Sequence, residues 1–442
     1  MRIHFIAIGG VIMHSLAIEL HENGHLVTGS DDVIYDPAKS NLSKHNLLPA
    51  YDGWNDNVIT RDLDMVIIGM HARLNNPELL KAQKIGVNIL SFPEFIWHYS
   101  QNKKRIVIAG SHGKTTITSM ILHVLNINNI QADYLLGAKI KSLTNLVSLK
   151  NHPLIIIEGD EYFSSPMDQS PKFLHYNPHV LVVSGVSWDH INVFPTLDAY
   201  KRAFKSILDS VIKSKGDIYY YKNDNFLYNY LKDNANAQSY LQSDYMIEDE
   251  VVYILSNDKK IPLKIFGNHN LQNLEAAKLV CLKLGVPKSV FYSSIQSFEG
   301  ADNRLNLIKK YVDNSCVYRD FAHSPSKVLA TVNAVKELYP DRQLISCFEL
   351  HTFSSLNPDF LSHYEQSFAH SDEVWIYIDS AKQKSKNITS YLISSAIKHH
   401  SLKMISNKKA LKSSLRAFVP CNNNLLLMSS GTFSGLDLKE YF

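Results

Sequence analysis

The residues best suited to carry out chemistry lie together in one short segment, residues 110–116, between an apolar run at 106–109 and a helix-like stretch at 115–126. Glycines let successive backbone N–H groups converge on phosphate oxygens, and the amino end of a helix adds partial positive charge. The ammonium of Lys114 can neutralise phosphates, and the hydroxyl of Thr115 can join a Mg²⁺ shell. Only two residues separate the first glycine from the Gly-Lys pair, so the segment predicts a shortened nucleotide-phosphate loop. Its residues are Gly110, Ser111, His112, Gly113, Lys114, Thr115 and Thr116.

Acids and an imidazole follow two further apolar runs. Glu158 ends the run at 154–157, with Asp160 and Glu161 behind it, and Asp189 and His190 follow the run at 180–184. In an open α/β sheet, ligands bind beyond the carboxyl ends of the strands. We therefore expect Glu158 and His190 to complete a Mg²⁺ shell with Thr115. The structural alternatives are a solvated acid for Glu158 and a capping or core histidine for His190.

Two weaker patterns concern nucleotide-like ligands. His269, Asn270 and Asn273 precede a predicted helix at 274–284, and amide side chains suit an adenine edge or a ribose. Taken alone, this pattern is an ordinary helix start. At the amino terminus, Gly9 and Gly10 form a turn, with an acid 22 residues beyond Gly9 at Asp31. This spacing predicts a diphosphate-bearing ligand, and simple strand–helix packing is the alternative.

These side chains require parallel sheets to position them. Strand-like runs at 3–8, 26–29, 65–68 and 87–90 alternate with helix-like stretches at 14–23, 37–45 and 76–86, as in a doubly wound sheet. The runs at 218–221 and 251–255 suggest a small antiparallel appendage. Strands at 317–320, 344–348, 373–378 and 425–428, with helices at 327–338 and 357–369, form a last α/β unit. We predict domains at 1–102, 103–299 and 300–442.

Composition excludes several classes of protein. The chain has 442 residues, which suggests about three domains, and 45% of them are hydrophobic. The net charge of +3 offers no electrostatic footprint for nucleic acid, and no apolar run approaches the ~18 residues of a membrane span. The start of the chain fits a buried first strand better than an export signal, so we expect a cytoplasmic protein. The four cysteines form no Cys-x-x-Cys pair, which argues against zinc or a redox dithiol.

In their order along the chain, these motifs resemble the Mur ligases, the ATP-dependent amide-forming enzymes of peptidoglycan assembly. The resemblance implies three domains: a Rossmann-like domain for UDP-N-acetylmuramate, a P-loop ATPase-like domain for ATP, and a Rossmann-like domain for the amine. ATP would convert a carboxylate to an acyl phosphate, which an amine then attacks. It implies Lys114, Glu158 and His190 as catalytic residues and implies no obligate protein partner.

The resemblance also assigns binding residues. It implies that ATP contacts the loop at 110–116 together with His269, Asn270, Asn273, Arg304 and Asp320. Gly9, Gly10, Ser30 and Asp31 would hold the UDP-sugar, and His323 and His351 the amine substrate. Two features depart from the family pattern. Ile12 stands where a third glycine is usual, and neither Lys201 nor Lys205 can be assigned as the carbamylated lysine that many members carry.

The identity of the amine depends on the third domain. Members that add L-alanine carry two arginines near residues 348–355, whereas this segment contains none. An arginine pair is the natural way to hold the carboxylate of a free amino acid. The sequence therefore favours the tripeptide L-alanyl-γ-D-glutamyl-meso-diaminopimelate over L-alanine. Two other classes of protein fit the sequence less well, because a nicotinamide dehydrogenase would leave residues 110–116 without a role and a nucleotide switch would leave the strand-end acids unexplained.

Overall fold

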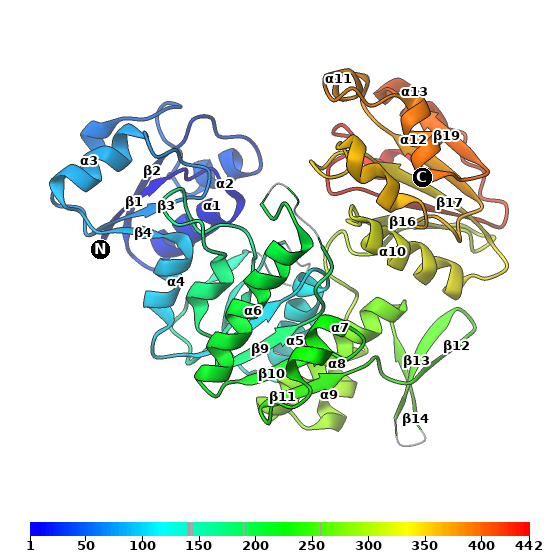
Figure 1. The fold of residues 1–442 in the computed structure, drawn as a ribbon, viewed down its shortest axis with the longest axis horizontal. Helices are drawn as coiled ribbons and strands as arrows, with labels where there is room; N and C mark the ends of the chain where they lie inside the picture. The colour runs from blue at the N-terminus through cyan, green and yellow to red at the C-terminus, as the bar shows by residue number, and fades with distance from the viewer. Residues whose placement is uncertain (139–142, 144, 189–190, 192, 257–258) are drawn as a thin grey trace. The chain divides into compact units, whose positions relative to one another are not determined.

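The computed structural model describes residues 1–442 except 139–142, 144, 189–190, 192 and 257–258. It is an α/β protein whose described strands form four sheets (Figure 1). The chain divides into two compact units. The first comprises residues Met1–Gly110, Ile121–Val186 and Asp198–Ser239, and the second comprises Ser111–Met120, Ser187–Leu197 and Tyr240–Phe442.

The first sheet is parallel, with the strand order β2-β1-β3-β4. The predicted alternation of strands and helices is confirmed here, although α1 begins directly after the glycine turn, earlier than residue 14. Helix α4 begins at a capping box in which Ser91 and Glu94 bond each other's backbone N–H groups. The elements are β1 (Arg2–Ile6), α1 (Val11–Glu22), β2 (Leu26–Ser30), α2 (Ala38–Lys44), β3 (Met65–Ile68), α3 (Pro77–Ile85), β4 (Ile89–Ser91) and α4 (Phe92–Ser100).

The central sheet has seven strands in the order β11-β10-β9-β5-β8-β6-β7. The sequence predicted that residues 218–221 belong to an antiparallel appendage, and this is wrong. Strand β10 pairs in parallel with β9 and buries its apolar and aromatic side chains, so it extends the main sheet. The elements are β5 (Lys104–Ala109), α5 (Lys114–Ile127), β6 (Asp133–Leu135), β7 (Val147–Ser148), β8 (Leu154–Glu158), β9 (Val180–Val183), α6 (Leu197–Lys213), β10 (Asp217–Tyr221), α7 (Asn225–Leu231) and β11 (Ala237–Tyr240).

Strands β12 (Tyr245–Glu248), β13 (Val251–Ser256) and β14 (Lys259–Leu263) do form a separate antiparallel sheet, as predicted for residues 251–255. Helices α8 (Asn268–Lys283) and α9 (Lys288–Ile295) follow. The last sheet has the order β15-β16-β20-β17-β18-β19. Its elements are β15 (Asn306–Lys310), β16 (Cys316–Asp320), α10 (Pro325–Leu338), β17 (Gln343–Glu349), β18 (Glu373–Tyr377), α11 (Ser380–Ser385), α12 (Ser390–Ile397), β19 (Leu402–Ile405), α13 (Lys408–Arg416) and β20 (Asn423–Met428).

The prediction of an α-helix at 357–369 is wrong about the type of helix. The structure has a 3-10 helix there, Pro358–Tyr364. Leu361, Tyr364 and Ser367 are all buried, and their spacing of three residues matches the three residues per turn of a 3-10 helix.

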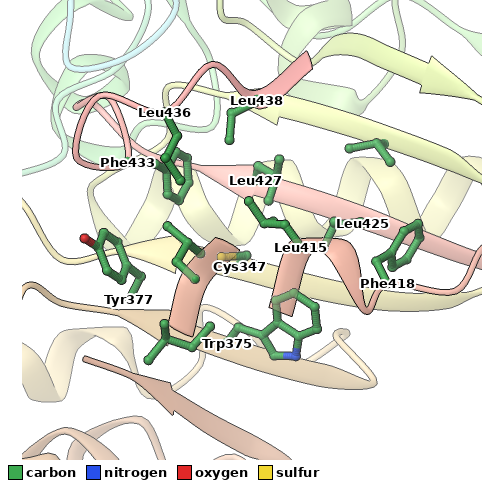
Figure 2. Close-up of a cluster of buried hydrophobic side chains, with 13 residues drawn as sticks. Cys347, Trp375, Tyr377, Leu415, Phe418, Leu425, Leu427, Phe433, Leu436 and Leu438 are labelled. Atoms are coloured by element: carbon green, nitrogen blue, oxygen red, sulfur yellow. The ribbon is translucent and has the colours of Figure 1, made fainter. Parts of the chain in front are cut away.

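One face of the last sheet carries an apolar core (Figure 2). Trp375 and Tyr377 of β18, with Leu425 and Leu427 of β20, pack against Leu415 of α13. Cys347 lies in this core, Cys281 and Cys316 are also buried, and Cys421 is exposed. Burial raises the pKa of the Cys281 and Cys347 thiols, which keeps them protonated.

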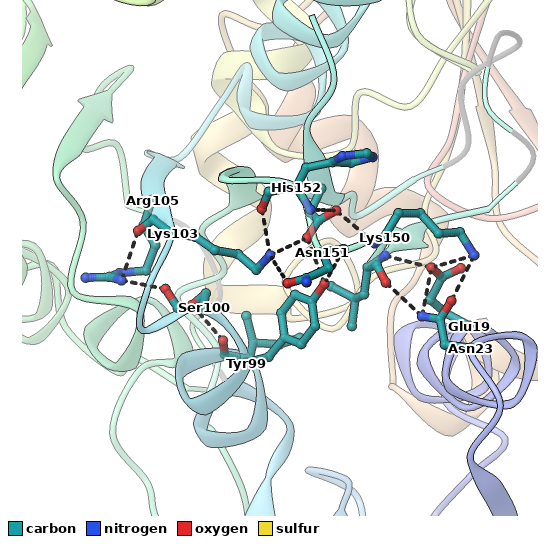
Figure 3. A network of polar contacts seen from close by, with 12 residues as sticks. Glu19, Asn23, Tyr99, Ser100, Lys103, Arg105, Lys150, Asn151 and His152 are labelled. Atoms are coloured by element: carbon teal, nitrogen blue, oxygen red, sulfur yellow. Dashed lines mark hydrogen bonds and ion pairs between the residues drawn. The ribbon is translucent and has the colours of Figure 1, made fainter.

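A polar network ties α1 and the end of α4 to the central sheet of the same unit (Figure 3). Glu19 accepts a hydrogen bond from the Leu149 N–H at 2.7 Å, and the Lys150 ammonium lies 3.1 Å from its carboxylate. Deeper inside, the Lys103 ammonium lies 3.1 Å from the carboxylate of Asp133, and both side chains are almost fully buried. The network therefore contains a buried carboxylate that is paired with the Lys103 cation and also accepts hydrogen bonds from the Tyr99 hydroxyl and the N–H groups of Lys150 and His152.

Removing that cation should destabilise the first unit. We expect Lys103→Met to lower the free energy of unfolding by about 3 kcal/mol, because Asp133 is left charged and buried. The control is Lys260→Met, which breaks an exposed pair with Glu248 and should cost less than about 1 kcal/mol. Urea unfolding followed by circular dichroism measures both. Equal losses in the two variants would contradict the argument.

Among the described residues, no helix combines the length and apolar character needed to cross a membrane.

Candidate active site

The predicted phosphate loop follows β5, in the middle of the central sheet. Gly110 has φ +125°, and a Cβ atom there would lie 2.3 Å from the Ser184 Oγ, so only glycine fits. Gly113 has φ +75°, and a Cβ atom there would lie 2.1 Å from the Asn273 Oδ1. The Ser111 hydroxyl accepts a hydrogen bond from the Ser187 N–H at 2.8 Å. Close contacts on both glycines thus fix the path of the loop.

Helix α5 begins at Lys114, so the backbone N–H groups of its first turn are directed at whatever the loop binds. Thr115 and Thr116 are buried, and the Thr115 carbonyl accepts a hydrogen bond from the Ser119 hydroxyl at 2.6 Å. A glycine-shaped loop, a helix start and a lysine together form an anion site suited to phosphates.

The two strand-end predictions have different outcomes. Glu158 is the last residue of β8, which pairs with β5, and it lies opposite Ile108. Its carboxylate accepts a hydrogen bond from the Gly137 N–H at 2.7 Å. His190, like Asp189, lies outside the described residues. Among the residues that are described, no cluster of three or more His, Cys, Asp or Glu side chains could hold a metal ion. Oxygen donors such as those of Glu158 and Thr115 are nevertheless the kind that Mg²⁺ prefers.

The adenine-site candidates lie inside a helix rather than before one. Helix α8 begins at Asn268, because Gly267 turns the chain with φ +87° and Asn270 then bonds the Phe266 carbonyl through its side chain. His269 is partly buried, and desolvation lowers its pKa despite the nearby charge of Asp320. Its Nδ1 atom has no hydrogen-bond partner among the described residues. Desolvation therefore favours the neutral imidazole.

Asp320, at the end of β16, is held by its neighbours. Its carboxylate accepts hydrogen bonds from the Leu305 N–H at 2.7 Å and the Ala322 N–H at 2.6 Å. The Arg304 guanidinium stacks over the Phe321 ring, 4.5 Å from the ring centre. The structure brings His269, Asp320 and Arg304 into one neighbourhood, because the charges of Asp320 and Arg304 both act on the His269 imidazole.

The amino-terminal turn borders a cavity of about 330 Å³ lined by Gly9, Gly10, Asp31, Tyr35 and His71, among others. The Asp31 carboxylate accepts a hydrogen bond from the Gly9 N–H at 2.7 Å. Burial raises the pKa of Asp31, although this hydrogen bond acts in the opposite direction. The Gly9 amide that sequence analysis assigned to a diphosphate is therefore engaged by the protein. Ser30 is buried, and its carbonyl accepts hydrogen bonds from the turn.

Lys201 and Lys205 both lie on α6 and face aromatic rings. Their ammonium groups stand 5.8 Å and 5.6 Å from the ring centres of Phe226 and Tyr230 on α7. These contacts account for both lysines as packing residues, and neither is assigned as a carbamylated lysine.

The predicted amine-site histidines lie at the carboxyl edge of the last sheet. The His323 Nδ1 atom lies 2.9 Å from the Phe321 carbonyl oxygen. The His351 Nδ1 atom lies 2.8 Å from the ammonium of Lys382, and the surrounding protein together with this cation lowers the pKa of His351. Sequence analysis missed this cation because it lies outside residues 348–355.

Two further residues were missed. Arg319 precedes Asp320 in β16, and its Nη2 atom lies 3.4 Å from the Gly431 carbonyl oxygen. The available signal was a charged residue inside the strand, immediately before Asp320. Ser326, near the start of α10, lies 2.8 Å from the Nε2 atom of His112 in the phosphate loop, and both belong to the second compact unit. The loop therefore lies beside the start of α10.

Comparison with known proteins shows which family has this sequence and fold. The Mur ligase family catalytic domain matches residues 2–104, and the Mur ligase middle domain matches residues 108–281. The UDP-N-acetylmuramate–L-alanine ligase of Caldicellulosiruptor bescii is 30% identical over 401 residues, which cover 87% of this chain and 85% of that protein. The chain belongs to the Mur ligase family. As a Mur ligase, it is an ATP-dependent enzyme that forms an amide bond in peptidoglycan synthesis.

Other Mur ligases are similar to this one over most of their length. The UDP-N-acetylmuramate–L-alanine ligase of Caldicellulosiruptor saccharolyticus is 29% identical, covering 91% of this chain and 88% of its own. Among solved structures, the alanine ligase MurC from Thermotoga maritima has a TM-score of 0.75 at 20% identity, covering 100% of this chain and 98% of that one. The murein peptide ligase from Psychrobacter arcticus has a TM-score of 0.67 at 23% identity, covering 98% and 97%. These likenesses confirm the predicted three-domain Mur ligase fold.

Proposed function

We propose that this Mur ligase joins an amine to UDP-N-acetylmuramate, using ATP to activate the muramoyl carboxylate. The observation that carries the proposal is the similarity to the Caldicellulosiruptor bescii ligase, which extends over 87% of the chain and includes the phosphate loop. We also propose the domain roles expected from the sequence: residues 1–102 bind the UDP-sugar, residues 103–299 bind ATP, and residues 300–442 bind the amine.

The proposed chemistry has two steps. A carboxylate oxygen attacks the γ-phosphorus of ATP, ADP leaves, and an acyl phosphate forms. The amine nitrogen then attacks the acyl carbon, phosphate leaves, and the nitrogen loses a proton. Lys114 and the α5 amides stabilise the negative charge that develops on the transferred phosphoryl group. Mg²⁺, with Thr115 and Glu158 as its proposed oxygen ligands, would supply further charge neutralisation.

For the amine, we propose L-alanine. The curated relatives reported above are L-alanine ligases, and they favour this substrate over the tripeptide that sequence analysis preferred. The tripeptide remains a second candidate, supported by the lack of arginine in residues 348–355. That support is weakened by Arg319 and Lys382, since both bring positive charge to residues at the same sheet edge.

Direct competition tests the amine. Purified protein is given ATP, UDP-N-acetylmuramate and equal concentrations of L-alanine and the tripeptide, and the nucleotide products are resolved by mass. We expect the L-alanine adduct to dominate, and ADP to appear only when UDP-N-acetylmuramate is present. A dominant tripeptide adduct would replace L-alanine with the second candidate. No ADP with either amine would refute the ligase proposal itself.

A further inference from the structure

One long stretch of the chain, residues 380–436, lacks acidic side chains. It contains nine Lys or Arg residues and no Asp or Glu, whereas the whole chain has 45 Lys or Arg and 42 Asp or Glu. Outside this stretch, acids outnumber Lys and Arg. The small net charge of the chain therefore conceals a strong local concentration of positive charge.

The fold gathers five of these cations around α13 and the neighbouring edge strand β19. Four of them, spaced three or four residues apart, lie on one side of the helix: Lys408, Lys409, Lys412 and Arg416. Another side of α13, including Leu415, is buried against the last sheet (Figure 2). The fifth is Lys403 of β19, whose ammonium lies 4.6 Å from the ring centre of Trp375 in the same core. We call these five residues the basic face.

The basic face meets solvent and neutral groups. Lys412 is partly exposed, and the other four cations are exposed. The Lys408 ammonium donates to the Ser434 carbonyl at 2.8 Å, and the Arg416 guanidinium lies 5.7 Å from the ring centre of Tyr441. A carbonyl and a ring orient these cations but do not neutralise them.

Three acids lie on elements that pack beside α13 or β19, and in the described part of the chain none of them forms an ion pair with the basic face. Glu373 of β18 instead accepts a hydrogen bond from the Trp375 indole at 2.6 Å. Asp437 caps the 3-10 helix Leu438–Tyr441 by accepting a backbone N–H at 3.1 Å, and Glu440 is exposed on that helix. The positive charge of the face is therefore available to an external anion.

The chemistry of the basic face suits an extended anionic surface. Four of its five cations are lysines, whose ammonium is a point charge that demands no matched geometry, whereas arginine forks suit bidentate recognition. The rings beneath the face, Trp375 and Phe418, are buried and cannot stack on nucleic-acid bases. Val419, just beyond α13, adds one exposed apolar side chain. These features favour a lipid surface over nucleic acid.

We propose that the basic face binds the surface of a bilayer that contains anionic phospholipids. Each cation held near such a surface strengthens binding by about fivefold. The attraction is peripheral, because α13 keeps its apolar side in the core of the last sheet. It is also sensitive to salt, because exposed charges are screened within about 10 Å at 0.1 M ionic strength. The inference goes beyond the ligase reaction and holds whichever amine is joined.

Sedimentation of the full-length protein with vesicles tests the proposal. One set of vesicles is phosphatidylcholine alone, and in the other about a third of the lipid is phosphatidylserine. We expect binding to the second set only, and release as salt rises towards about 1 M. The double variant Lys409→Gln with Lys412→Gln should bind about 25-fold more weakly. Its thermal unfolding and its ligase rate with soluble substrates should match those of the unmodified protein.

The matched control removes the same two charges elsewhere. Lys213 ends α6 and Lys232 follows α7, and both are exposed, so Lys213→Gln with Lys232→Gln should bind the vesicles like the unmodified protein. Equal binding by the two double variants would overturn the inference, as would equal binding of the unmodified protein to phosphatidylcholine alone. Displacement of the protein from anionic vesicles by a stoichiometric amount of an oligonucleotide would overturn it in favour of nucleic acid.

Discussion

Replacing Lys114 with alanine should lower the rate of ATP-dependent ligation by about 10²- to 10³-fold while the chain stays folded. The path of the phosphate loop is set by Gly110 and Gly113, whose positions admit no side chain, and not by the lysine. The ammonium is therefore a charge that the fold does not need for its shape. Its loss removes a preorganised contact to the phosphoryl group during transfer.

The measurement is the release of phosphate at saturating ATP, with thermal unfolding recorded for the same preparations. The control is Lys104→Ala, at the exposed start of β5, the strand that leads into the loop. It should leave both quantities unchanged. Phosphate release near the original rate in Lys114→Ala would remove this residue from the proposed mechanism.

Gly113→Ala should cost about 10²-fold in kcat/KM for ATP. The new methyl group would lie 2.1 Å from Asn273 Oδ1, so either the loop or the start of α8 must shift. A displacement of about 1 Å in a positioning group can cost 10²-fold in rate. The left-handed backbone at φ +75° adds strain for any residue with a side chain.

Gly86→Ala separates these two causes. Gly86 also has φ +75°, but nothing lies within 4 Å of a Cβ atom built there. The Gly86→Ala variant should lose about 1 kcal/mol of folding stability from backbone strain and retain the activity of the unmodified protein. Equal activities in the two variants would show that contact with Asn273 does not matter to the loop.

Much of the fold was predictable because buried parallel strands have continuous runs of apolar residues in the sequence. The runs at 154–157 and 180–184 became β8 and β9, and the glycine loop between 106–109 and 115–126 lies between β5 and α5 as predicted. Errors arose where local patterns are ambiguous. Residues 218–221 are one isoleucine followed by three tyrosines, a run with little apolar contrast, so only tertiary pairing with β9 decides their place.

The candidate site was predicted most directly where its residues are contiguous. The loop and its glycines form one segment, whereas Ser326, which contacts His112 of the loop, lies 214 residues further along the chain and reaches the loop only through the fold. Asp31 illustrates another limit. Its spacing from Gly9 was noticed, but sequence cannot tell whether a carboxylate will bond a ligand or its own turn, and here it bonds the turn.

The place of β20 has a consequence for how the protein is made. This strand, Asn423–Met428, lies between β16 and β17, although some 70 residues of chain separate it from the end of β17. All strands of the first sheet can pair once β4 has left the ribosome. Strands β16 and β17, in contrast, are joined only by β20 and cannot enter one sheet until β20 has been translated. Ser429 and Gly431, which contact Glu349 and Arg319, arrive at the same moment. During synthesis, a growing chain can therefore complete the sheet beside the cavity at Gly9 and Asp31 long before the sheet that carries Glu349 and Arg319, and it exposes unpaired strand edges in the interval.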